Sequence, residues 1–109
     1  MITCFIRYEI DPFTVAAFER YARAWGQAIP LCDADLIGYF APHEGSATTA
    51  DGVSNVSDLA ACEAYRARLH ADPAAQANFA FARQERFIRK EDRIFLRLVT
   101  APHAERTTS

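Results

Sequence analysis

The sequence has no long apolar run, no glycine-rich loop and no close-spaced pair of cysteines. Without about eighteen consecutive apolar residues, no membrane-spanning helix is predicted. Residues 1–5 lack a basic segment followed by an apolar block, so a signal peptide is not expected. The cysteines Cys4, Cys32 and Cys62 lie far apart, which argues against a metal pair. They are expected to be reduced, buried thiols of a cytoplasmic protein.

An excess of charge of either sign is also missing. The 109 residues include 12 basic and 14 acidic side chains, which give a formal net charge of −2. Nucleic acids and anionic membranes attract a concentrated positive field, so neither is an expected partner. The four glycines are scattered, and no serine elbow or nucleophilic cysteine motif occurs. No nicotinamide, flavin, nucleotide or other cofactor is therefore predicted.

The residues that are present fit one globular domain. Hydrophobic residues make up 50% of the chain and charged residues 24%, proportions that favour a packed core over disorder. A chain of this length can build a single core of modest size. Residues 1–100 are predicted to form that domain. Residues 101–109 are small, polar and aperiodic, which predicts a flexible C-terminal tail.

Four segments have the residue pattern of strands: residues 2–10, 36–41, 49–56 and 93–99. In the first, the even-numbered residues form a fully apolar face. The third is the weakest, because Asp51 and Gly52 disfavour a strand. In the last, we expect the apolar set Ile94, Leu96 and Leu98 to lie on the face that the helices cover.

Three segments predict helices that begin at capping residues: after Asp11-Pro12, after Ser57 or Asp58, and after Asp72-Pro73. Pro30 is expected to close the first helix, and the third is expected to run to about Ile88. Each segment has an apolar stripe at helical spacing. The predicted stripes are Phe18, Tyr21, Ala22, Trp25 and Ile29 in the first helix, Leu59, Cys62, Tyr65 and Leu69 in the second, and Ala77, Phe81, Gln84 and Ile88 in the third.

The order of these elements predicts an α+β fold of the ferredoxin-like, split βαβ kind. A four-stranded antiparallel sheet would have its helices on one face. The bare face would cover about 400 Å², near the limit that monomers usually leave exposed. We expect it to present Phe5, Phe95 and Val99 beside Arg7 and Arg97. Covering it with a second copy predicts a homodimer, although the charged residues on this face would also suit a monomer.

Three blocks of the sequence resemble the NIPSNAP family: LIGYFAPHEGS, DLAACEAYRARLHADP and ANFAFARQERFIRKEDRIFLRLV. The resemblance spans about residues 2–99. It implies a dimeric α+β barrel, in which two ferredoxin-like sheets close on one another, and a biochemical activity that is poorly defined. It also implies a relationship to small barrel monooxygenases and isomerases that hold a ligand between sheet and helices. The sequence departs from the family in its polar third strand and at Cys62, where an aromatic residue is expected.

Two groups of residues are candidates for chemistry. His43 beside Glu44 could act as a general base, because the pKa of histidine lies near neutrality, but Pro42 and Gly45 also favour a plain turn. The aromatic residues Tyr8, Trp25 and Tyr39 could line a ligand pocket between sheet and helices, or could simply be core. No histidine or cysteine pair has metal-ligand spacing, so no metal site is predicted.

Two functions follow from the resemblance and the aromatic residues. The first is a cofactor-independent, monooxygenase-like protein that binds or transforms a small aromatic or apolar molecule near Tyr8, Trp25, Tyr39, His43 and Glu44. An apolar cavity that excludes water would serve such chemistry. The second is a non-enzymatic homodimeric interaction module whose contact surface is formed by residues 65–87. An enclosed cavity of roughly 300 Å³ or more that includes His43 or a tyrosine hydroxyl would favour the first function, and a packed interior with His43 in solvent would favour the second.

Overall fold

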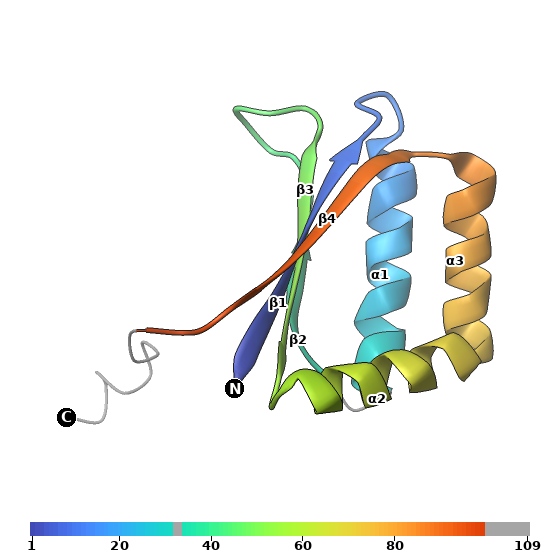
Figure 1. Cartoon of the computed structure of the whole chain (residues 1–109). Coiled ribbons are helices and arrows are strands. Elements are labelled where there is room, and N and C mark those ends of the chain that lie inside the picture. Colours follow the sequence, from blue (N-terminus) through green and yellow to red (C-terminus); the bar gives the residue numbers. More distant parts are fainter. Residues whose placement is uncertain (32–33, 100–109) are drawn as a thin grey trace.

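The computed structural model describes residues 1–31 and 34–99, and there a four-stranded antiparallel sheet has three helices on one face (Figure 1). The strands are β1 (Ile2–Ile10), β2 (Asp35–Phe40), β3 (Thr49–Val56) and β4 (Ile88–Leu96), and the helices are α1 (Val15–Leu31), α2 (Leu59–Ala71) and α3 (Pro73–Glu85). The strand order is β2-β3-β1-β4, which confirms the ferredoxin-like prediction. The predicted tail lies outside the described residues.

The helix-covered face of β1 holds the predicted even-numbered residues. Cys4, Tyr8 and Ile10 are buried there, whereas Arg7 and Glu9 are exposed on the other face. The stripe on α1 is also confirmed, since Phe18, Tyr21, Trp25 and Ile29 are buried. The rings of Tyr8 and Phe18 lie with centroids 5.4 Å apart, so β1 and α1 meet through an aromatic core.

Helix α1 begins later than the sequence predicts. Asp11 does not cap the helix, because its Oδ1 accepts a hydrogen bond from the backbone N–H of Phe13 at 2.9 Å. This contact holds a short turn over residues 11–13, and the helix starts at Val15. At the other end, Pro30 lies in the last turn of α1 instead of beyond it, and the helix ends at Leu31.

The predicted caps of α2 and α3 are confirmed. Asp58 accepts from the Ala61 N–H at 2.7 Å, and Asp72 accepts from the Ala75 N–H at 2.8 Å. The predicted face of α3 is only partly correct: Phe81 packs against the core, but Ala77 and Gln84 are exposed, and the buried residues are Ala75 and Asn78.

A hydrogen bond between α3 and α1 explains this rotation. The side-chain amide of Asn78 donates to the backbone carbonyl of Tyr21 at 3.0 Å, so the polar residue lies inside. Helix α3 also ends earlier than predicted, at Glu85. Arg86 adopts a left-handed conformation with φ 52°, and Ile88 is the first residue of β4.

The predicted faces of β4 are reversed in the structure. Its pairing with β1 places Ile94 opposite Phe5 and Leu96 opposite Thr3, on the face without helices. Residues directly opposite in a sheet share a face, so Phe95 and its neighbour Arg93 lie on the helix side. Strand β4 also starts at Ile88 and ends at Leu96, so Arg97, Leu98 and Val99 lie beyond the sheet.

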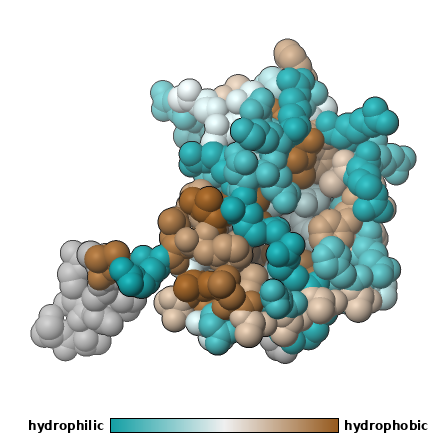
Figure 2. All heavy atoms as spheres, in the orientation of Figure 1, coloured by the Kyte–Doolittle hydropathy of each residue, from teal (hydrophilic) through white to brown (hydrophobic). Residues whose placement is uncertain are grey.

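The open face of the sheet combines apolar and charged side chains. Hydrophobic residues gather on the helix-free side of the molecule in Figure 2. Phe5, Ile94 and Leu96 border a hollow of about 350 Å³ with Arg7 and Asp92. Arg7 forms an ion pair of 3.0 Å with Asp51 across the β1–β3 pairing, which gives the unusual acidic residue of β3 a partner. Within the described ranges, no helix is long and apolar enough to cross a membrane.

Candidate functional site

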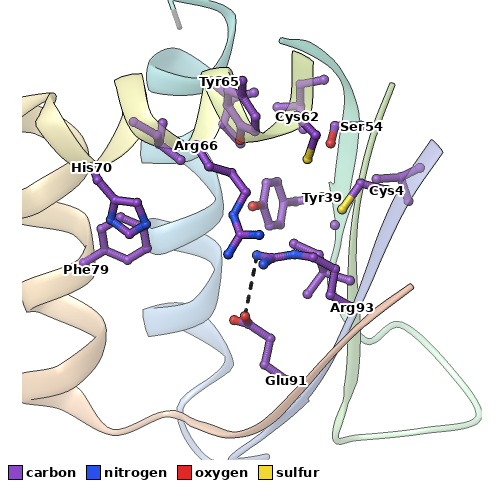
Figure 3. Close-up of a pocket in the computed structure, with 16 residues that line it drawn as sticks. Cys4, Tyr39, Ser54, Cys62, Tyr65, Arg66, His70, Phe79, Glu91 and Arg93 are labelled. Atoms are coloured by element: carbon purple, nitrogen blue, oxygen red, sulfur yellow. Dashed lines mark ion pairs between the residues drawn. The ribbon is translucent and has the colours of Figure 1, made fainter. Parts of the chain in front are cut away.

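A cavity of about 230 Å³ lies between the helix side of the sheet and helices α2 and α3 (Figure 3). Its apolar walls come from β1, β2 and all three helices: Ile6, Leu36, Ile29, Leu69 and Phe79. The His70 ring stacks on that of Phe79 with centroids 5.3 Å apart and borders the cavity on its helix side. This is the place between sheet and helices where the sequence predicts a ligand.

One of the uncharged polar groups that line the cavity belongs to Tyr39. Its ring stacks on that of Tyr8 with centroids 6.2 Å apart. Burial raises the pKa of both phenols above their ordinary value of 10.0. Tyr39 therefore keeps its proton at neutral pH and can donate a hydrogen bond to an oxygen atom in the cavity.

Three charged side chains also line the cavity. Arg66 comes from α2, and Glu91 and Arg93 come from β4. Glu91 and Arg93 form an ion pair of 3.8 Å, and the Arg66 guanidinium extends from the helix toward them (Figure 3). Charges from two separate elements thus meet at one side of an otherwise apolar space.

Two cysteines form part of the wall where α2 meets the sheet. Cys4 and Cys62 are both buried, neither forms a disulfide, and their sulfur atoms lie on the same side of the cavity (Figure 3). Burial raises the pKa of the Cys4 thiol, and the nearby Arg93 opposes this shift only in part. Cys4 therefore stays protonated at neutral pH and behaves as a small apolar group, not as a nucleophile. Cys32 lies outside the described residues.

The cavity and its fold allow a comparison with known proteins. The profile of the NIPSNAP family matches residues 3–102, nearly the whole chain. The chain belongs to the NIPSNAP family. No curated protein sequence matches it.

Solved structures agree with this assignment. An uncharacterised NIPSNAP domain protein from Burkholderia xenovorans is 25% identical, with a TM-score of 0.72 over 94% of this chain and 97% of that one. A putative antibiotic biosynthesis monooxygenase from Nitrosomonas europaea is 8% identical, with a TM-score of 0.67 over 92% and 100%. SnoaB, a cofactor-independent oxygenase from Streptomyces nogalater, is 14% identical, with a TM-score of 0.56 over 92% and 94%. The last two likenesses show a shared fold, that of the dimeric α+β barrels.

The structure separates the predicted site residues into two groups. Tyr39 lines the cavity, Tyr8 lies directly behind it, and Trp25 packs in the core against Phe79 with ring centroids 4.9 Å apart. His43 and Glu44 lie elsewhere, in the loop between β2 and β3 at the end of the sheet away from α2 (Figure 1). Both are exposed beside a separate shallow hollow, so the catalytic role of His43 stays a prediction.

Sequence reasoning did not identify Arg66, Glu91 or Arg93. A signal for Arg66 was present, because it follows the buried Cys62 by four positions and precedes the buried Leu69 by three. A polar residue at such spacing borders the buried face of its helix. Arg93 could be placed only with the register of β4. Among the residues that the structure describes, no three His, Cys, Asp or Glu side chains are grouped to hold a metal.

Proposed function

We propose that this protein binds a small aromatic or apolar molecule in the cavity beside Tyr39 and transforms it without a cofactor. The observation that carries this proposal is a buried phenol whose hydroxyl faces an apolar space of about 230 Å³ between the sheet and the helices. This volume is below the roughly 300 Å³ expected for such a site, and His43 is exposed, which is the position expected for the non-enzymatic interaction module with its contact surface on residues 65–87. The open space beside a tyrosine hydroxyl favours the small-molecule site over that module. The shared fold with a cofactor-independent oxygenase supports the reaction class.

The chemistry follows from the surroundings of Tyr39. Such chemistry uses molecular oxygen as the oxidant and an electron-rich substrate that is shielded from water. The apolar walls exclude water, which strengthens electrostatic interactions inside the cavity. A neutral phenol donates a hydrogen bond to the oxygen on which negative charge develops, and it needs no reorganisation to do so. Tyr8 behind Tyr39 fixes the position of that donor.

We further propose that the protein works as a homodimer in the cytoplasm, joined through the open sheet face. Phe5, Ile94 and Leu96 supply the apolar centre of this face, and Arg7 and Asp92 supply both signs of charge. A face with both signs is complementary to its own copy about a two-fold axis. The sheet contributes about 400 Å², half of the roughly 800 Å² per partner of a stable interface. The exposed side chains of Leu98 and Val99, which lie past the end of the sheet, add further apolar area (Figure 1).

A thermal-shift screen against small phenols and quinone-like compounds tests the proposed function. Binding to the folded state raises the melting temperature by mass action. Cys62→Phe places a ring into the cavity and should abolish the shift, whereas Cys62→Ser leaves the space open and should retain it. Oxygen uptake with each binding compound then tests turnover, which Tyr39→Phe should lower about tenfold or more. Equal shifts in both Cys62 variants would place the ligand elsewhere, and binding without oxygen uptake would remove the oxygenase assignment.

A further inference from the structure

Two arginines from different elements reach the same side of the cavity. Arg66 belongs to α2 and Arg93 to β4, and the two guanidinium groups lie near one another below the Tyr39 ring in Figure 3. An arginine side chain has five N–H donors, no acceptor and a permanent positive charge. A pair of them beside apolar walls is therefore suited to an anion that also has an apolar part.

The acidic side chains near these arginines do not balance their charge. Among the described residues, Glu91 is the one acid that lines the cavity. Its Oε2 lies 3.8 Å from Nη2 of Arg93, beyond the distance of a good hydrogen bond. Within the same described part of the chain, no acid pairs with Arg66. Two guanidinium charges face one carboxylate, so the cavity has one excess positive charge.

The residues at the two ends of the cavity differ in their exposure to solvent. The side chains of Arg93 and Glu91 are 31% and 41% exposed, so the charged end lies at the opening. Leu69 is 7% exposed and Cys4 is 6% exposed, so the apolar end lies deeper. A bound molecule would place its charged group near the solvent and its apolar body against Leu69 and Phe79.

We infer that the cavity takes a small monocarboxylate with a single ring or an apolar body of similar size, and that Arg66 and Arg93 hold its carboxylate. Guanidinium groups match a carboxylate in geometry. One negative charge on the ligand would neutralise the excess positive charge of the cavity, whereas a dianion would leave it with a net negative charge. The volume of about 230 Å³ is smaller than the roughly 300 Å³ at which pockets for drug-sized ligands begin. This inference rests on the proposed function and names the substrate class of the same cavity.

Isothermal titration calorimetry with benzoate and benzamide tests the inference, because the two probes have nearly the same shape and differ in charge. Arg66→Gln removes one guanidinium from the cavity. Arg68→Gln makes the same change on the same helix, where the side chain borders a different surface hollow. Helix α2 is capped by Asp58 and both arginines are exposed on it, so both variants should fold.

The expected result is that wild type binds benzoate at least tenfold more tightly than benzamide. Arg66→Gln should lose about tenfold in benzoate affinity and leave benzamide within twofold, while Arg68→Gln should match wild type. Equal affinity for both probes, or benzoate binding that Arg66→Gln does not change, would overturn the carboxylate inference and leave the small-molecule site standing. Failure of both probes to bind at millimolar concentration would overturn the inference and the proposed site together.

Discussion

Gly52 of β3 lies directly opposite Tyr39 of β2, and the ring of Tyr39 occupies the space where a side chain at position 52 would stand. A Cβ atom added to Gly52 would lie 2.7 Å from Cε1 and 3.0 Å from Cζ of that ring. Such distances are too short for non-bonded carbon atoms. The glycine that weakens the sequence pattern of β3 therefore allows Tyr39 to reach the cavity and Tyr8.

Gly52→Ala should destabilise the protein and disturb the site at the same time. Because the new methyl group displaces the Tyr39 ring, we expect a loss of about 1–3 kcal/mol in the free energy of unfolding. Urea unfolding measures this loss, and the thermal shift given by a binding phenol should fall in the same variant. Gly38→Ala is a matched control on β2, because a Cβ there would come no nearer than 4.0 Å to another side chain. Equal effects of the two changes would contradict the role given to Gly52.

The buried tyrosines should make the protein less stable in alkali. Burial raises the pKa of Tyr8, Tyr21 and Tyr39, so the native state keeps protons that the unfolded chain releases near pH 10. This stability is fully present below pH 10 and falls as the pH rises further. Tyr8→Phe removes one such group, so above pH 10 its free energy of unfolding should fall less steeply, by up to about 1.4 kcal/mol per pH unit. Urea unfolding between pH 8 and 11 measures both slopes, and parallel curves would refute the explanation.

Asn78 should contribute more to the free energy of unfolding than the exposed residues of α3 do. It is 6% exposed, and its amide donates to the Tyr21 carbonyl in α1. Asn78→Ala removes this bond between the helices and leaves the buried space of the amide unfilled, at a cost of about 1–3 kcal/mol, although the Tyr21 carbonyl keeps its partner within α1. Ala77→Gly on the exposed face of the same helix should cost about 1 kcal/mol through helix propensity alone. Chemical denaturation compares the two, and a smaller cost for Asn78→Ala than for Ala77→Gly would contradict this role.

A charge on the open sheet face should separate the proposed dimer. Leu96→Asp places a carboxylate among the apolar residues of that face, whereas Leu59→Asp makes the same change at an exposed position on α2. Sedimentation velocity at micromolar concentration should give a dimer for wild type and Leu59→Asp, and a monomer for Leu96→Asp. A wild-type particle of 12.2 kDa, the mass of one chain, would refute the dimer.

His43→Ala separates the two candidate centres for catalysis. If oxygen uptake takes place in the cavity beside Tyr39, this exposed loop change should leave the rate within about twofold of wild type. A loss of tenfold or more would restore His43 as a catalytic residue and would require the substrate to reach the β2–β3 loop. The rate with Tyr39→Phe, measured in the same assay, shows that the assay responds to a change at the cavity.

The sequence predicts the fold more completely than the site. Period-two alternation located β1 and its buried face, and Asp58 and Asp72 marked the starts of two helices, because these signals depend only on neighbouring residues. The faces of β4 could not be predicted in this way. Both faces of that strand contain large apolar residues, and only the pairing with β1 decides which of them meets the helices.

The candidate site depended on the same long-range information. Tyr39 was predicted because an aromatic residue on a strand is a common pocket wall. Arg66 and Arg93 come together only when α2 and β4 are placed on the sheet, and a rotation of α3 put Asn78 where Ala77 was expected. His43 was predicted as a general base because the pKa of histidine lies near neutrality, although its loop borders a different hollow from the cavity beside Tyr39.

The location of a bound aromatic compound tests the account most directly. Crystals soaked in 4-iodophenol and measured for anomalous scattering would place the iodine atom without reference to any assumed site. The account predicts a peak inside the cavity, in contact with Leu69 or Phe79, with the phenol oxygen toward Tyr39. Peaks only beside His43 or on the open sheet face near Leu96, with an empty cavity, would contradict it.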